Sequence, residues 1–171
     1  TNFEKMGFSP TYYVIEDYLV AEDRMDEINS YSKSVKFFGH YLEYVLNYDS
    51  SSVPINVNID YSNYSGFPHF SKSASDQVWV GGTVSYLCMQ LAFFMGFKEI
   101  YLIGFDHNYT IPGDIEKDSN GLTLRSNSDD PNHFSKDYFG EGKRWHDPNM
   151  SRMELAYRKA MEVYSSESRS I

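Results

Sequence analysis

The chain has 171 residues, of which 41% are apolar, so its length suits the core of one domain and hardly of two. The formal net charge is −9, and the chain has no basic cluster of the kind that binding to nucleic acid or to an anionic membrane requires. We therefore predict no nucleic-acid partner. The longest apolar run, residues 86–97, is too short to span a bilayer. A single cysteine, Cys88, excludes an intramolecular disulfide and fits a reducing compartment, which predicts a cytoplasmic location.

The first third of the chain predicts alternating strands and helices. Residues 11–15 are β-branched and aromatic, which predicts a buried strand. Four apolar residues then recur at helical spacing: Tyr18, Ala21, Met25 and Ile28. This spacing predicts one amphipathic helix. A short strand at 35–38 and a helical pattern at 41–46 follow. Residues 55–60 alternate with period two and predict a further strand with one wetter face.

The middle of the chain predicts a β-α-β crossover. Val78–Val80 predicts a short strand that enters the turn Gly81-Gly82-Thr83, and residues 84–95 have the spacing of a buried helix. Gly96 stands where a helix C-terminus favours glycine, and residues 99–103 predict the second strand. Such a crossover joins parallel strands. We therefore predict an α/β fold with a Rossmann-like, open, mainly parallel sheet flanked by helices.

Residues 104–149 show no sustained periodicity and are rich in Asp, Asn, Ser, Gly and His. A segment of that length in a compact domain is typically a functional loop, so we predict one long loop that covers an active site. Asp147 predicts the N-cap, and Pro148 the first position, of a final helix that extends through Tyr164. Residues 1–171 are then one predicted α/β domain.

Candidate ligand-binding residues follow two predicted strands, because ligands of open parallel sheets bind beyond the carboxyl ends of the strands. Gly81 and Gly82 allow close backbone approach, and the helix start at Thr83 favours an anion such as phosphate. Thr83 can cap that helix or donate its hydroxyl to the ligand. The alternative for Gly81 and Gly82 is a tight turn against a neighbouring strand. At the second strand end, Asp106 can bind a metal, orient a sugar hydroxyl or hold a His tautomer. The alternative for Asp106 and its neighbour His107 is a capped, solvated turn.

The long segment supplies two further histidines, His133 and His146. A His with a near-neutral pKa is an economical general base for a hydroxyl nucleophile, and a structural role is the alternative for each. We predict that other polar and aromatic residues line the substrate or donor site: His107, Asn108, Tyr12 and Tyr138. The sequence has no HExxH, CxxC, P-loop or GxSxG pattern, which argues against a zinc hydrolase, a Walker-type kinase and an α/β-hydrolase.

Four strings carry a resemblance to a known family: Gly-Phe-Ser-Pro-Thr-Tyr-Tyr at 7–13, Gly-Gly-Thr-Val at 81–84, Met-Gly-Phe-Lys-Glu-Ile-Tyr-Leu-Ile-Gly-Phe-Asp at 95–106, and His-Phe-Ser-Lys-Asp-Tyr-Phe-Gly at 133–140. They resemble the 6-hydroxymethylpterin diphosphokinase MptE-like family over nearly the whole chain. Members of that family in bacterial surface-polysaccharide and flagellin-modification clusters are similar in turn to the sialyltransferases of glycosyltransferase family 42. The resemblance implies transfer of a sialic-acid-like sugar from a CMP donor to a surface-glycan hydroxyl, with His146 as the first choice for the general base and His133 as the second.

Both groups carry a Gly-Asn-Gly-Pro-Ser-like nucleotide loop before the segment equivalent to 11–15, and this chain has no such loop. We therefore expect a fragment of a longer protein that lacks its first β-α unit, and we do not expect the fragment alone to keep full activity. Two other functions stay open. One is a pterin diphosphokinase with ATP as donor and Mg²⁺ held by Asp106 and its neighbours, and the other is a non-catalytic binding module. The enzyme's partners would be a nucleotide or nucleotide sugar and a small hydroxyl acceptor.

Overall fold

The computed structural model describes residues 7–60, 66–105, 108–110, 114–119, 123–127, 129, 131–133, 138, 141–146 and 148–171. Within them the chain forms, in order, β1 (Tyr12–Ile15), α2 (Tyr18–Asp23), α3 (Met25–Ser30), β2 (Val35–Gly39), the short 3-10 helix η1 (His40–Leu42), β3 (Ser52–Ile55), β4 (Val57–Asn58), β5 (Val78–Trp79), α4 (Val84–Phe94), β6 (Ile115–Lys117), β7 (Thr123–Ser126), β8 (Arg144–His146) and α5 (Met150–Ser166).

Three parallel strands form the main sheet, in the order β1-β2-β3. The register pairs Ile15 of β1 with Phe38 of β2, and Phe38 with Pro54 of β3. A second parallel sheet pairs β4 with β5 through Val57 and Val78. The predicted α/β class with mainly parallel strands and flanking helices is therefore confirmed.

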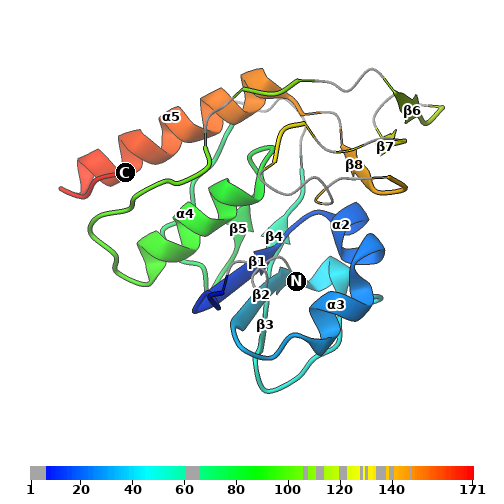
Figure 1. Cartoon of the computed structure of the whole chain (residues 1–171). Coiled ribbons are helices and arrows are strands. Elements are labelled where there is room, and N and C mark those ends of the chain that lie inside the picture. The colour runs from blue at the N-terminus through cyan, green and yellow to red at the C-terminus, as the bar shows by residue number, and fades with distance from the viewer. Residues whose placement is uncertain are drawn as a thin grey trace.

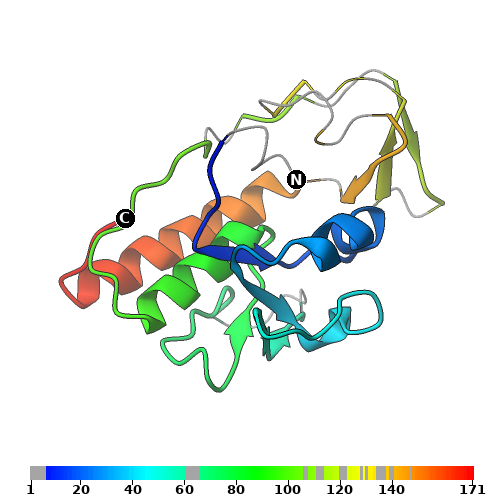
Figure 2. The same cartoon turned by 60° about the horizontal axis from the view of Figure 1, so that its bottom comes forward.

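Helices cover the main sheet on both faces because alternate side chains of a strand point to opposite sides. Phe38 packs on one face with residues of α2, α3 and η1, namely Ala21, Ile28 and Leu42. Phe37 packs on the other face with Leu87 and Leu91 of α4. Figures 1 and 2 show α5 running beside α4 on the side away from β1. These two helices share a buried aromatic and apolar cluster that contains Tyr86, Met89, Phe93, Ala156, Ala160 and Tyr164.

The buried helix predicted after the glycine turn is confirmed as α4. Thr83 caps it, with its hydroxyl oxygen accepting from the Ser85 backbone N–H at 3.4 Å. Gly96 follows the helix end with φ +87°, a conformation that favours glycine. The sheet covers one side of α4 and α5 covers another, which explains why the helix has apolar residues on several faces.

Three predictions for the first third of the chain were wrong in detail. The helix predicted from Tyr18 to Ile28 is divided at Arg24, which ends α2 and begins α3, so Tyr18 is exposed and Leu19 is buried instead. The pattern at 41–46 forms only η1 and turns. The strand predicted at 55–60 is divided at Asn56, where the chain passes from the main sheet into the second one.

Residues 99–103 do not form the predicted second strand of the crossover. One parallel bridge joins Glu99 to Ser170, and Ile100 N–H donates to Ser170 O at 3.0 Å. A strand requires a neighbouring backbone to satisfy its N–H and C=O groups. No described strand runs beside residues 101–103, so these residues have no regular secondary structure and Ile103 lies at a bend.

Residues 104–149 contain more structure than the predicted loop. Strands β6, β7 and β8 form an antiparallel sheet in that order, with Leu124 of β7 paired with Trp145 of β8. Strands of three or four residues are too short to give a clear alternation in the sequence. The N-cap of α5 is Asn149, whose side chain accepts from Arg152 N–H at 3.0 Å, whereas the predicted cap Asp147 lies outside the described residues. No helix in the described part of the chain is long and apolar enough to cross a membrane.

Candidate functional site

His146, the first-choice base, forms a hydrogen-bonded pair with Asp17. The distance from His146 Nδ1 to Asp17 Oδ2 is 2.9 Å. The other oxygen of Asp17 accepts from Leu19 N–H at 2.7 Å and so caps α2. The carboxylate is thus held by the start of a helix, and it in turn orients the imidazole. We call this arrangement the Asp17–His146 pair.

The surroundings of His146 favour a base that stays partly accessible. The hydrogen bond to Asp17 raises the pKa of His146 above its ordinary value, burial opposes the rise, and the negative charges of Asp17, Glu16 and Asp118 add to it. The side chain of His146 is 40% exposed, and the ring of Tyr18 lies against it at 5.0 Å between centroids. No described residue bonds to Nε2. With Nδ1–H held by a carboxylate, Nε2 is the nitrogen that can accept a proton.

The Asp17–His146 pair lies at the carboxyl end of β1, which finishes at Ile15. Both overall views show the starts of α2, α4 and α5 on the same side of the molecule, together with the antiparallel sheet (Figures 1 and 2). Open parallel sheets bind their ligands at this edge. The position of the pair therefore agrees with the position expected for an active site.

Arg144 holds β8 against α2 next to this pair. Its backbone N–H donates to Asp23 Oδ2 at 2.8 Å, and its guanidinium donates to Asp23 Oδ1 at 2.6 Å and to Glu22 Oε2 at 2.9 Å. Glu22 also accepts from Tyr44 OH, and these bonds lower the pKa of the Glu22 carboxyl, the bond from Tyr44 most strongly. The contacts fix the strand that carries His146.

His133, the second-choice base, lies at the other end of α2. Its ring stacks on Tyr138 with centroids 4.3 Å apart, and the guanidinium of Arg24 lies over Tyr138 at 5.2 Å. Arg24 also donates a hydrogen bond to the Tyr138 carbonyl oxygen. Asp17 precedes α2 and Arg24 follows it, and a rise of about 1.5 Å per residue separates these helix ends by about 10 Å. His146 therefore bonds to the residue before α2, whereas His133 is linked to the residue after α2 through Tyr138.

The glycine turn makes close packing contacts with α4 and α5. A Cβ on Gly81 would lie 2.5 Å from the Tyr86 ring and 2.8 Å from Ala156 Cβ. Gly82 has φ +85°, and a Cβ there would lie 3.3 Å from the stem of Arg152. The tight-turn alternative and the capping role of Thr83 thus have direct support. A donor-binding role for these three residues stays a prediction.

The remaining predicted site residues are dispersed or undescribed. Tyr12 begins β1, at the opposite end of the strand from Asp17, and its ring lies 5.9 Å from that of Phe37. Asn108 is exposed, two residues from Thr110, whose backbone N–H and C=O both bond to the Asn132 side chain at 2.7 and 2.8 Å. Asp106 and His107 lie outside the described residues, so the predictions for them remain untested.

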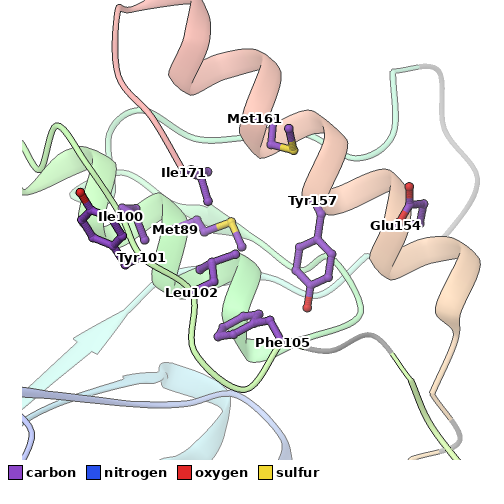
Figure 3. Close-up of a pocket in the computed structure, with 9 residues that line it drawn as sticks. All are labelled: Met89, Ile100, Tyr101, Leu102, Phe105, Glu154, Tyr157, Met161 and Ile171. Carbon is purple, nitrogen blue, oxygen red and sulfur yellow. The ribbon is translucent and has the colours of Figure 1, made fainter.

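A hollow of about 460 Å³ lies elsewhere, between residues 100–105 and the helices α4 and α5 (Figure 3). Most of its lining is apolar, including Met89, Leu102, Phe105 and Tyr157. None of the predicted site residues lines it. Its one carboxylate, Glu154, accepts a hydrogen bond from Arg158 at 2.7 Å. Within the described ranges, no group of three or more His, Cys, Asp or Glu side chains could hold a metal ion.

Asp17 is the candidate site residue that the sequence interpretation missed. A local signal for it exists, because an Asp that follows a strand and precedes a helix is a typical N-cap at the ligand-binding edge. Its partner His146 is 129 positions away, so the sequence alone does not indicate the contact.

A model of the family described as 6-hydroxymethylpterin diphosphokinase MptE-like matches residues 1–112. No curated protein and no solved structure matches the chain. The matched span contains β1, Asp17, the glycine turn and α4, and it ends before β8 and His146.

Proposed function

Because the chain belongs to the 6-hydroxymethylpterin diphosphokinase MptE-like family, we propose that it takes part in nucleotide-dependent transfer of a diphosphate group to the hydroxyl of a hydroxymethylpterin. The Asp17–His146 pair is the observation that supports a catalytic role. Its carboxylate is fixed by a helix start, its imidazole is half-buried, and the free ring nitrogen can accept a proton from an alcohol.

The proposed step moves one proton and exchanges one phosphorus–oxygen bond. Nε2 of His146 takes the proton of the acceptor hydroxyl while that oxygen attacks the β-phosphorus of ATP. The bond from the β-phosphorus to the α,β-bridging oxygen breaks, and AMP leaves. Asp17 keeps Nδ1 protonated and stabilises the imidazolium that forms.

The donor phosphates are proposed to lie at the start of α4. The first backbone N–H groups of a helix, together with its dipole, favour an anion. Arg152, whose stem lies against Gly82, adds a positive charge near this helix start. A bound Mg²⁺ would supply charge neutralisation for the phosphates, but no cluster of ligands for it is present among the described residues, and Asp106 remains only a predicted ligand.

Isothermal titration with ATP, CMP, CMP-sialic acid and a reduced hydroxymethylpterin tests the proposal. We expect ATP and the pterin to bind, and we expect formation of AMP and pterin diphosphate when both are supplied with Mg²⁺. His146→Gln should abolish turnover while leaving ATP binding within a factor of about three, because general base catalysis acts on the chemical step. Binding of CMP-sialic acid without binding of ATP would contradict the proposal.

Glycosyl transfer is a second candidate, and the place of His146 favours it. His146 lies just before the final helix, where the resemblance to family 42 sialyltransferases puts the general base. The same pair would then deprotonate a glycan hydroxyl that attacks the anomeric carbon of a CMP-linked sugar. Release of CMP from CMP-sialic acid in the presence of a glycan acceptor, lost in His146→Gln, would support this candidate over the first. Ligand binding without any turnover would leave the binding-module alternative.

A further inference from the structure

Two exposed tyrosine rings lie near the Asp17–His146 pair, on the surface where α2 meets β8. Both overall views show these two elements side by side (Figures 1 and 2). Tyr18, the first residue of α2, is 42% exposed, and the centroid of its ring lies 5.0 Å from that of His146. Tyr44, in the turn after η1, is 61% exposed. Both rings therefore present aromatic surface to a ligand beside the candidate base.

Glu22 connects the two rings. It is four residues after Tyr18 and so lies on the same side of α2. Its Oε1 accepts from Tyr44 OH at 2.6 Å, and its Oε2 accepts from the guanidinium of Arg144 at 2.9 Å. The bond to Glu22 raises the pKa of Tyr44 to about 12, and Tyr18 is close enough to add to this rise. We call the surface formed by Tyr18, Glu22 and Tyr44 the tyrosine face. Rings that are already held in place lose little conformational freedom when a ligand stacks on them.

The charges around the tyrosine face disfavour an anionic ligand. The carboxylates of Asp17, Glu16 and Asp118 lie close enough to His146 to raise its pKa. The guanidinium of Arg144 is a positive charge at the same place, but it forms ion pairs with two carboxylates of α2. Carboxylates repel a phosphate group or a further carboxylate. The start of α4 favours anions instead, so the phosphates of a donor and the ring of an acceptor have separate places.

We propose that the tyrosine face binds the acceptor alcohol through an uncharged heteroaromatic ring, which stacks on Tyr18 and Tyr44 and directs its hydroxymethyl group to Nε2 of His146. This inference rests on the proposed function and adds the place and the charge of the acceptor. Stacking on a tyrosine ring needs an open ring face and no charge on the ligand. Because the ring of Tyr18 contacts that of His146, a ligand ring stacked on Tyr18 lies next to the base, as proton transfer from its hydroxyl requires.

Isothermal titration with 6-hydroxymethylpterin in the absence of ATP tests where the ring binds. We expect Tyr18→Ala to raise the Kd of the pterin about 10-fold and Tyr44→Ala to raise it about 5-fold, as loss of a stacking partner does. Tyr18→Phe should keep this Kd within a factor of about two, because the ring remains. The Kd of ATP should stay the same in all three variants, which also shows that they are folded. Tyr101→Ala is the matched control and should change neither Kd, since Tyr101 is an 83% exposed tyrosine in the separate hollow.

The charge of the ligand gives a second readout. Pterin-6-carboxylate has the same ring system, with a carboxylate in place of the hydroxymethyl group. We expect the unmodified chain to bind it about 10-fold or more weakly than 6-hydroxymethylpterin at about 20 mM NaCl, and this gap should narrow at about 200 mM because salt screens the repulsion. Equal affinity for the two pterins, or a gap that salt leaves unchanged, would overturn the proposed charge of the acceptor.

The outcomes separate this inference from the proposed function. An unchanged Kd of the pterin in Tyr18→Ala and Tyr44→Ala, with turnover retained, would overturn the tyrosine face and leave the transfer reaction standing. Pterin binding that depends on Tyr18, without formation of pterin diphosphate from ATP, would support the tyrosine face and contradict the transfer reaction. Weaker binding of ATP but not of the pterin in Tyr18→Ala would assign the tyrosine face to the donor and overturn the inference. Absence of pterin binding to the unmodified chain would overturn both.

Discussion

Asp17 uses its two carboxylate oxygens for different bonds, one to the start of α2 and one to His146. Replacement by Asn keeps the helix cap, because an amide oxygen can still accept from Leu19 N–H. It removes the charge that stabilises the protonated imidazole. We therefore expect Asp17→Asn to reduce kcat about 100-fold or more with little change in melting temperature. Steady-state kinetics and a thermal melt check this.

His40→Gln is the matched control for the pair. His40 also contacts a carboxylate through Nδ1, at 2.6 Å from Glu43 Oε1, but it is an exposed residue in a local turn. Its substitution should change kcat by less than a factor of about two. Equal losses of kcat in Asp17→Asn and His40→Gln would contradict a specific role of Asp17 in the reaction.

The raised pKa of His146 gives activity a defined pH dependence. The base must be neutral to accept a proton, so kcat should rise with pH through a value above the ordinary 6.5 of a histidine. In Asp17→Asn the hydrogen bond from a charged partner is lost, and the rise should move to lower pH. An acid limb at the same pH in both proteins would show that His146 does not titrate in the reaction.

The same shift links His146 to stability. A histidine whose pKa is higher in the folded protein stabilises the fold fully below its unfolded value of about 6.5. That contribution is lost as the pH rises through the folded value. The Asp17–His146 pair should therefore stabilise the attachment of β8 to α2 more at pH 6 than at pH 8, by an amount that His146→Gln removes.

Gly81 lies where any side chain would meet its neighbours. An alanine Cβ would come within 2.5 Å of Tyr86 and 2.8 Å of Ala156, both of them buried. We expect Gly81→Ala to lower the free energy of unfolding by about 2 kcal/mol, as overpacking of a core does. Gly142→Ala is the control, because nothing lies within 4 Å of its Cβ position and only its positive φ opposes alanine. Urea denaturation of both variants measures the difference.

At the scale of elements, β8 depends on Arg144 for its contact with α2. Arg144→Met removes charged hydrogen bonds to Asp23 and Glu22 but keeps the length of the side chain. We expect a loss of about 2 kcal/mol, visible as faster proteolysis within the antiparallel sheet, together with lower kcat because His146 is on the same strand. Arg125→Met on β7, at the exposed position paired with Arg144, should have neither effect.

Local chemistry explains which elements could be predicted from the sequence. Capping residues mark both ends of α4, with Thr83 at its start and Gly96 after its end. The bounds of this helix can therefore be predicted from nearby positions. Residues 99–103 have strand composition, but a strand also needs a neighbour, and that neighbour is not specified locally. The short strands β6, β7 and β8 depend on pairing across the chain for the same reason.

The same distinction between local signals and distant contacts applies to the candidate site. His146 could be chosen from its residue type and its place before the final helix. The partner Asp17 could not, because the contact depends on how the antiparallel sheet docks on α2. Gly81 and Gly82 were correctly predicted as a turn, but their contacts with α5 required the positions of Ala156 and Arg152.

At the scale of the whole molecule, the net charge of −9 opposes the approach of a nucleotide anion. Added salt screens this long-range repulsion. We therefore expect the association rate constant for ATP to stay constant or rise between about 20 and 200 mM NaCl, measured by stopped-flow fluorescence. The neutral nucleoside adenosine is the control. A steep fall of the rate with salt would indicate a basic funnel that outweighs the overall charge.

The Asp17–His146 contact closes a span of 129 residues. Closing so large a loop costs more chain entropy than closing any of the turns inside it, so the contact is expected to form late in folding, after β1 has joined its sheet and α4 has packed on it. The proton acceptor would then be assembled only in molecules whose two ends have already met. Catalytic competence would thus appear after helical circular dichroism has reached its final value in a refolding experiment, and the lag between the two signals would measure the time taken by that last closure.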